Sequence, residues 1–304
     1  MNNKKYLITV VGPTAIGKTS LAIKLAKEYH AEIISSDSRQ FYKEMRIGTA
    51  VPEEEELAEA KHHFIQHKSI FEDYSVGDFE KEASKMLHKL FTSNNFVIMA
   101  GGSGLYNDAV IKGLDDFPDI DPSIRQQLNQ QLKKDGIEAL QDRLKSLDPD
   151  HFNNMDVQNP HRLIRALEIC MGTGKPYSSF LNQKKEQRNF QTIKIGLTAE
   201  RETIYNRINQ RVGVMMQNGL LEEARKLHQY KNLNALQTVG YKELFNYLDG
   251  KWTLDFAVSE IKKNTRRFAK RQLTWLRKDE DILWFDHTAN LSDILLKVNQ
   301  KIEA

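Results

Sequence analysis

Cysteine is almost absent from this sequence, because Cys170 is the only one among 304 residues. A single thiol excludes an intramolecular disulfide, a zinc site built from cysteines and an iron–sulfur cluster. Long apolar runs are missing too, and none approaches the roughly 20 residues that a membrane-spanning helix needs. The first residues, MNNKKYLITVVGPT, lack the cleavage site of a secretory signal. We therefore expect a cytoplasmic protein with no membrane span, in which Cys170 is a small buried side chain.

A strong net charge is also missing, since 44 Lys and Arg face 41 Asp and Glu, which leaves +3. The charge is unevenly distributed, however. Residues 261–278 (IKKNTRRFAKRQLTWLRK) contain eight Lys or Arg and no acid. Such a segment is typical of a protein that binds a phosphate-rich partner, although a basic helix by itself is more often only solvated.

Short apolar runs alternate with helical patterns in the first third of the chain. Strands are predicted at 5–11, 31–37, 95–104 and within 62–70, with helices at 18–30 and 76–91. This alternation predicts a parallel sheet with helices on its faces. A proline-broken helical stretch follows, then a strand at 191–199 and helices at 201–218, 219–230, 240–248 and 254–278. We expect an α/β core (1–114 and 191–304) with an all-helical insertion (115–190).

The segment between the first strand and the first helix fits the pattern G-x-x-x-x-G-K-[ST]. Glycines permit a tight loop whose backbone N–H groups wrap a diphosphate, the lysine adds a positive charge, and the hydroxyl can bind Mg²⁺. The pattern does not say what the diphosphate carries, so ATP is only one candidate. The predicted phosphate-binding residues are Gly12, Pro13, Thr14, Ala15, Ile16, Gly17, Lys18 and Thr19, with Thr19 as the metal ligand.

Two further segments lie where strands are expected to end, which is the edge at which open α/β sheets bind ligands. Asp37 follows AEIISS and can bind Mg²⁺ through water, accept a proton from a nucleophile, or simply cap a turn. The segment 101–106 (GGSGLY) follows the fourth strand with glycines and Ser103, where a nucleotide hydrolase typically has an aspartate. It permits close approach of a bulky ligand, although a plain glycine turn explains it too.

An ordered set of motifs along most of the chain resembles the tRNA dimethylallyltransferases, also called tRNA isopentenyltransferases. Ser103 stands where this family usually has threonine, and Val51 where lysine often precedes proline. The matching segments are GPTAIGKT (12–19), DSRQFYKEMRIGTA (37–50), HHFIQHKSIFEDYSVGDF (62–79), GGSGLY (101–106), NPHRLIRALEI (159–169), QTVGYKEL (237–244) and KRQLTWLRK (270–278).

The resemblance implies a P-loop NTPase-like fold and a prenyl transfer. Dimethylallyl diphosphate would bind the loop at 12–19 with Mg²⁺ near Thr19. The N6 amine of the adenosine 3′ to a tRNA anticodon would attack the allylic carbon, and diphosphate would leave. Asp37 would take the N6 proton, Arg211 would contact the diphosphate, and Ser103 would hydrogen-bond nearby. From the residues alone, Arg211 would be assigned to a solvated helix face.

The resemblance also implies that the partner is a tRNA anticodon stem-loop, whose target adenine is extruded into the pocket. The helical insertion, with Arg162 and Arg165, would hold the stem, and Tyr241 is a possible stacking surface. A monomer is expected. The implied tRNA-binding residues are Asp37, Ser38, Arg39, Gln40, Asn159, Arg162, Gln237, Gly240, Tyr241, Lys242, Lys270, Arg271, Gln272 and Arg277.

Three other functions stay open at this point. A nucleotide or small-molecule kinase would use the same loop with ATP, but it does not explain the basic segment or the insertion. A prenyltransferase of free adenine nucleotides would need no extended RNA surface. A noncatalytic RNA-binding NTPase switch would need an acid after an apolar strand and a residue that positions water, and neither is clearly present.

Overall fold

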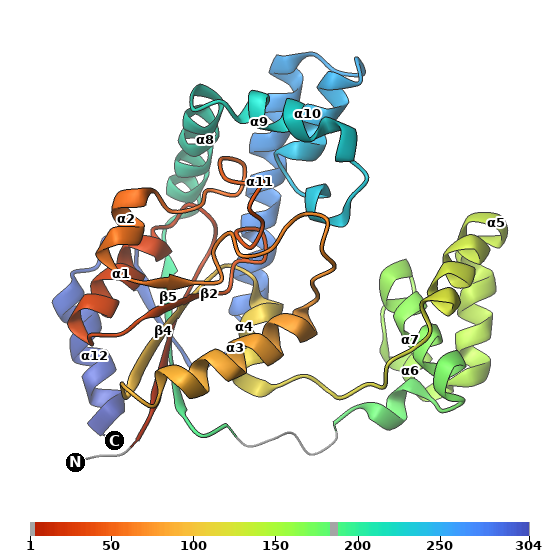
Figure 1. Ribbon diagram of the computed structural model, residues 1–304, viewed down its shortest axis with the longest axis horizontal. Coiled ribbons are helices and arrows are strands. Elements are labelled where there is room, and N and C mark those ends of the chain that lie inside the picture. The colour runs from red at the N-terminus through yellow and green to blue at the C-terminus, as the bar shows by residue number, and fades with distance from the viewer. Residues whose placement is uncertain (1–3, 183–187, 304) are drawn as a thin grey trace. The chain divides into compact units, whose positions relative to one another are not determined.

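The computed structural model describes residues 4–182 and 188–303. In these residues six strands form one parallel sheet in the order β3-β2-β4-β1-β5-β6 (Figure 1). The expected parallel α/β sheet is therefore confirmed, with five of its six strands predicted. The strands are β1 (Tyr6–Val11), β2 (Ile33–Ser35), β3 (His62–His63), β4 (Phe96–Ala100), β5 (Gln191–Thr198) and β6 (Ile282–Asp286).

Most of the helices agree with predicted segments to within a few residues at their ends, although some, such as Gly104–Lys112, had no predicted counterpart. They are α1 (Lys18–Glu28), α2 (Glu54–Glu59), α3 (Val76–Leu90), α4 (Gly104–Lys112), α5 (Pro122–Leu147), α6 (Pro149–Asn154), α7 (Pro160–Thr173), α8 (Arg201–Gln217), α9 (Leu220–Leu227), α10 (Tyr241–Leu248), α11 (Leu254–Leu276) and α12 (Leu291–Glu303). The described part of the chain contains no helix that is long and apolar enough to cross a membrane.

The sheet separates two apolar cores because successive residues of a strand face opposite sides. Along β1, Ile8 and Val10 pack in one core with α1 and α12, whereas Leu7 packs in the other core with α3. Figure 1 shows α1 and α12 on one side of the sheet and α3 and α4 on the other. Since β1 is buried along its whole length, the loop that follows it is held at a fixed place.

The last strand and helix were not predicted. β6 pairs with β5 at the edge of the sheet, and α12 packs through Ile294 and Val298 against the β1 side that carries α1. The Tyr6 hydroxyl donates to the Ile302 carbonyl oxygen over 3.1 Å, so the first strand is tied to the last helix. β6 is only five residues long and follows a charged turn, which left its apolar run too short to assign.

Residues 113–187 form a second compact unit, separate from the sheet-containing unit. Its described elements are α5, α6, α7 and the short 3₁₀ helix Tyr177–Phe180. Leucines of α5 and α7 make its core, in which Cys170 is buried as expected. The nearly buried Glu168 carboxylate pairs with the guanidinium groups of Arg125 (2.8 Å) and Arg165 (2.9 Å), which compensates the cost of burying its charge.

Candidate functional site

The loop after β1 has the backbone conformation that its glycines allow. Gly12 and Gly17 have φ values of 148° and 110°, in the region that favours glycine. A Cβ atom at Gly12 would lie 2.6 Å from the Leu197 carbonyl oxygen, so no side chain fits there. Gly17 is the residue before α1, whose first N–H groups have no partner inside the helix. The loop therefore presents backbone donors at the carboxyl edge of the sheet.

Three side chains hold this loop. The Lys18 ammonium donates to the Pro13 carbonyl oxygen over 2.9 Å, and the Arg207 Nε of α8 donates to the Ala15 carbonyl oxygen over 2.8 Å. The backbone N–H of Thr14 donates to Oε1 of Gln272, in α11, over 2.9 Å. The loop is thus fixed by helices that occur some two hundred residues later in the chain.

Two partly buried cations lie beside the loop. Burial lowers the pKa of Lys18 to about 8, although the nearby Asp37 raises it and Arg211 lowers it further. Burial also lowers the pKa of Arg211, again opposed by Asp37. Both charges are partly removed from water, and in the described part of the chain no carboxylate lies at ion-pair distance from either, which makes the place favourable for an anion.

Asp37 and Ser103 come from adjacent strand ends and lie close together. The Asp37 carboxylate accepts the backbone N–H of Arg39 over 3.1 Å. The hydroxyls of Ser38 and Ser103 are 3.2 Å apart, and Ser103 Oγ also accepts the backbone N–H of Ser38. This contact links the turn after β4 to the segment that carries Asp37.

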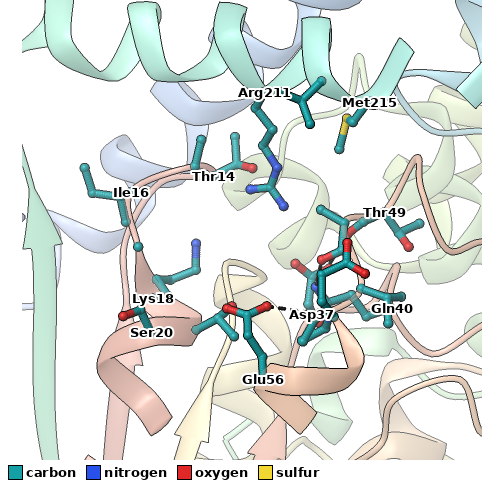
Figure 2. Close-up of a pocket in the computed structure, with 18 of the residues that line it drawn as sticks. Thr14, Ile16, Lys18, Ser20, Asp37, Gln40, Thr49, Glu56, Arg211 and Met215 are labelled. Carbon is teal, nitrogen blue, oxygen red and sulfur yellow. Dashed lines mark hydrogen bonds between the residues drawn. The ribbon is translucent and has the colours of Figure 1, made fainter. Parts of the chain in front are cut away.

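Two cavities, each of about 800 Å³, meet at this point. The first is lined by the loop at 12–19 and by α2, and the second by the turn after β4, α10 and α11. Figure 2 shows Lys18, Arg211, Asp37 and Glu56 pointing into the first cavity. The two cavities share Thr14, Asp37, Thr49, Ala50, Arg211 and Met215.

The wall between the cavities is held by one carboxylate. Glu223 of α9 accepts three consecutive backbone N–H groups, those of residues 46, 47 and 48, over 2.8–3.0 Å. Its remaining partner is the hydroxyl of Tyr241, at 2.6 Å. A Cβ atom at Gly48 would lie 2.6 Å from the Tyr241 ring, so the loop passes directly over the ring. Thr49 and Ala50, which line both cavities, come directly after this held segment.

Comparison with known proteins identifies the family. The model of the family described as IPP transferase matches residues 40–279. The chain belongs to this family. The tRNA dimethylallyltransferases of Christiangramia forsetii and Flavobacterium psychrophilum are 63% and 59% identical to it, over 98% of this chain and 98% and 99% of theirs. The predicted resemblance is confirmed.

Solved structures of IPP transferases are also similar to this chain. The tRNA isopentenylpyrophosphate transferase of Bacillus halodurans is 37% identical, with a TM-score of 0.72, over 99% of this chain and 96% of that one. A eukaryotic dimethylallyltransferase, in a structure described as acting on tRNA, is 27% identical with a TM-score of 0.81, over 98% and 78% of the chains. The predicted P-loop NTPase-like fold is confirmed.

Most of the residues predicted to bind tRNA lie around the second cavity. It is lined by Ser38, Arg39, Gln237, Gly240, Lys242, Arg271 and Gln272, together with Asp37 and Ser103. Lys270 of α11 and Arg277, which directly follows this helix, are exposed but line neither large cavity. Asn159 and Arg162 belong to the helical unit, where Asn159 caps α7 by accepting the backbone N–H groups of residues 161 and 162. Arg162 is exposed, whereas Arg165 is paired with Glu168.

The prediction that Tyr241 offers a stacking surface is wrong. Its side chain is fully buried, and burial together with the neighbouring Glu223 raises the pKa of its hydroxyl.

Gln40 is also nearly buried, and its amide donates to the Ala50 carbonyl oxygen over 2.8 Å. A direct RNA contact by Gln40 or Gln272 would require each to give up hydrogen bonds inside the protein.

A magnesium ion fits the first cavity only together with a ligand that brings its own oxygen atoms. Among residues 4–182 and 188–303, no three His, Cys, Asp or Glu side chains are grouped to hold a metal. Thr19 lines the cavity, and the carboxylates of Asp37 and Glu56 line it too. Magnesium commonly keeps several waters and binds through substrate phosphates, so this sparse set of oxygen ligands is compatible with it.

Sequence reasoning missed several residues of the site. Glu223 and Met215 had been assigned no role, and nothing in their local pattern separates them from ordinary helical residues. For Tyr241 a signal existed, because Tyr241, Leu244, Phe245 and Leu248 have the i, i+3, i+4, i+7 spacing of a buried helix face. That spacing predicts a buried Tyr241.

Proposed function

We propose that this chain transfers a dimethylallyl group from dimethylallyl diphosphate to N6 of the adenosine that follows a tRNA anticodon. The single observation that carries the proposal is the meeting of two cavities at Asp37 and Arg211. One cavity has the partly buried cations and backbone donors that a diphosphate needs. The other is open to a larger partner and has basic and aromatic side chains along it.

On the donor side, the diphosphate lies against the backbone N–H groups of the loop at 12–19, with Lys18 and Arg211 as counter-charges. Both cations are partly buried, so their charges are screened less than those of exposed side chains. Thr19 would hold a magnesium ion together with the diphosphate, and the ion would supply positive charge against the leaving group. The allylic end then points to the junction, where Met215 and Ala50 provide apolar contact.

On the acceptor side, the N6 amine enters through the second cavity and forms a bond to C1 of the allyl group. The C1–O bond breaks, and its electrons leave with the diphosphate. An aromatic amine is a weak nucleophile, so Asp37 accepts the proton that N6 loses. Ser103 and Ser38 hydrogen-bond beside this point. Lys18, Arg211 and the loop N–H groups stabilise the negative charge that develops on the leaving oxygen.

The size and rim of the second cavity favour RNA over a free nucleotide. Phe268 and Trp275 of α11 line it and are partly exposed, and the Arg271 guanidinium lies 5.8 Å from the Phe268 ring centre. Aromatic and arginine side chains are the usual stacking partners of unpaired bases. Arg162 of the helical unit, Lys270 and Arg277 supply further positive charge for phosphates. We further propose that the protein acts as a monomer.

The test is transfer of labelled dimethylallyl diphosphate to unmodified tRNA with Mg²⁺, beside parallel reactions with AMP and with ATP. Label on N6 of the adenosine next to the anticodon supports the proposal. Label on AMP but not on tRNA would retain the chemistry and overturn the RNA partner. ATP consumption without any prenyl transfer would indicate a kinase or a nucleotide switch instead.

A further inference from the structure

Gln272 lies in the most basic helix of the chain, yet its side chain is turned inward. It is 7% exposed, whereas its neighbours Lys270, Arg271 and Trp275 are exposed. Its Oε1 accepts the Thr14 N–H over 2.9 Å, and its Nε2 donates to the Gly102 carbonyl oxygen over 2.8 Å. One amide therefore joins the loop after β1 to the turn after β4.

The space around this amide leaves it little freedom. A Cβ atom at Gly102 would lie 2.2 Å from Nε2 of Gln272, so the turn approaches the amide as closely as glycine allows. On the other side of the same turn, the buried Asn107 accepts the Ser36 hydroxyl over 2.6 Å. The turn is therefore packed between α11 and the end of β2.

The two groups that Gln272 joins belong to the two halves of the site. Thr14 lines both cavities and precedes Lys18 in the diphosphate loop. Gly102 precedes Ser103, whose hydroxyl contacts Ser38 next to Asp37. The distance between the diphosphate and the proton acceptor therefore depends on the bridge that Gln272 makes.

Only a side chain with both a donor and an acceptor can make this bridge. A neutral amide has both, whereas an ionised carboxylate has only acceptors and an ammonium has only donors. A carboxylate here would keep the bond from Thr14 and face the Gly102 carbonyl oxygen with a second acceptor. It would also place a negative charge beside the bound diphosphate.

We propose that Gln272 is a positioning residue that fixes the diphosphate loop relative to the Ser103 turn, and that it does not contact RNA. This inference rests on the proposed function, because it concerns the geometry of that transfer. Substitution of Gln272 should therefore change the rate of the chemical step. The exposed cations around it on α11 act on RNA affinity instead.

The first test compares Gln272→Met with Thr274→Ala. Methionine fills nearly the same volume but makes neither hydrogen bond, while Thr274 lies two residues further along α11 with its hydroxyl bonded to its own helix. We expect the single-turnover rate of Gln272→Met to fall about 10- to 100-fold, as small misplacements of reacting groups do. We expect its RNA affinity to stay within about twofold and Thr274→Ala to match the wild type.

The second test is the pH profile of Gln272→Glu, with a melting curve for each variant. When protonated, the introduced carboxyl again offers a donor and an acceptor, so its rate relative to wild type should rise as the pH falls from 8 to 5.5. A flat ratio, or a Gln272→Met variant that loses RNA affinity but keeps its rate, would overturn the proposal. Wild-type protein that never prenylates tRNA would instead count against the proposed function.

Discussion

The two cavities differ in the residues that line them and in the kind of ligand that each suits. The first is lined by a short, glycine-dependent loop that is fixed by hydrogen bonds within the protein, and by two partly buried cations. The second is lined by side chains from several helices, and its aromatic residues Phe268 and Trp275 are exposed. A diphosphate has one shape and a fixed charge, so a rigid cavity suits it. An RNA loop is large and adaptable, and it needs a wide surface.

This difference separates the expected effects of mutation. Changes in the first cavity should alter the chemistry or the donor affinity, with little effect on RNA. Changes around the second should alter RNA affinity and its salt dependence. Asp37 and Arg211 line both cavities, and effects there should be the largest.

Asp37→Asn should have the largest effect. The amide keeps the size of the side chain but cannot accept the N6 proton, so we expect transfer to fall about 10²- to 10⁴-fold. RNA affinity should change little and donor affinity should not fall, because the substitution keeps the shape of the cavities and removes a negative charge near Lys18 and Arg211. Single-turnover transfer, with separate binding titrations, measures this. A parallel loss of donor affinity would assign Asp37 to binding.

Donor affinity should fall as the pH rises through about 8. The pKa of Lys18 is lowered to about that value by burial, so the free protein loses this positive charge above pH 8 and keeps it below about pH 7. Binding a diphosphate favours the ammonium, and it should therefore be accompanied by proton uptake near pH 8.5. Calorimetry in buffers of different ionisation enthalpy measures the uptake. Lys18→Arg should show none, and equal uptake in that variant would assign the titration to another group.

Glu223→Gln should have a moderate effect. Both carboxylate oxygens accept hydrogen bonds, from three backbone N–H groups and the Tyr241 hydroxyl, whereas the amide has one oxygen acceptor and an NH₂ group that would face donors. We expect the free energy of unfolding to fall by about 1–3 kcal/mol and the loop at 46–50 to become more mobile. The matched control is Glu222→Gln, an exposed neighbour paired with Arg225, which should cost at most about 0.5 kcal/mol. Urea unfolding compares the two, and equal losses would disprove the assigned role.

Arg162→Ala should have the smallest effect. Its guanidinium is exposed in the helical unit, so removing one phosphate contact should weaken RNA binding a few-fold and lower the salt-dependence slope by about one. Arg201→Ala is the control, because Arg201 is an exposed arginine of α8 that lines neither large cavity. Titrations of an anticodon stem-loop at several salt concentrations give both slopes. An unchanged slope for Arg162→Ala would remove this residue from the RNA surface.

The sequence predicts the local parts of this protein well. The alternation of strand and helix, the loop at 12–19 and the inserted helices all follow from short-range patterns, and the structure contains them. It predicts less well which side of a helix a polar residue occupies. Gln272 is among the tRNA-binding residues that the family resemblance implies, in a segment rich in Lys and Arg. Its spacing from Ile261, Ala269 and Leu276 nevertheless places it on the buried face of α11.

Other features depend on contacts between distant segments, which no local pattern contains. Glu223 acts on backbone N–H groups some 175 residues earlier, and its own helix shows only alternating apolar and charged residues. The edge strand β6 is recognisable only from its partner β5. Tertiary contacts decide whether a short apolar run forms a strand and which groups a single buried polar side chain binds.

The order of the strands also has a consequence for synthesis. The central strand β1 pairs on one side with β5, which emerges from the ribosome only after the whole helical unit, and Arg211 and Gln272 emerge later still. During synthesis, one edge of β1 therefore stays unpaired after the first hundred residues have been made, until β5 has been made as well. Non-local pairing of this kind is slow. A nascent chain that is halted within residues 113–187 should therefore expose an unpaired strand edge and bind chaperones.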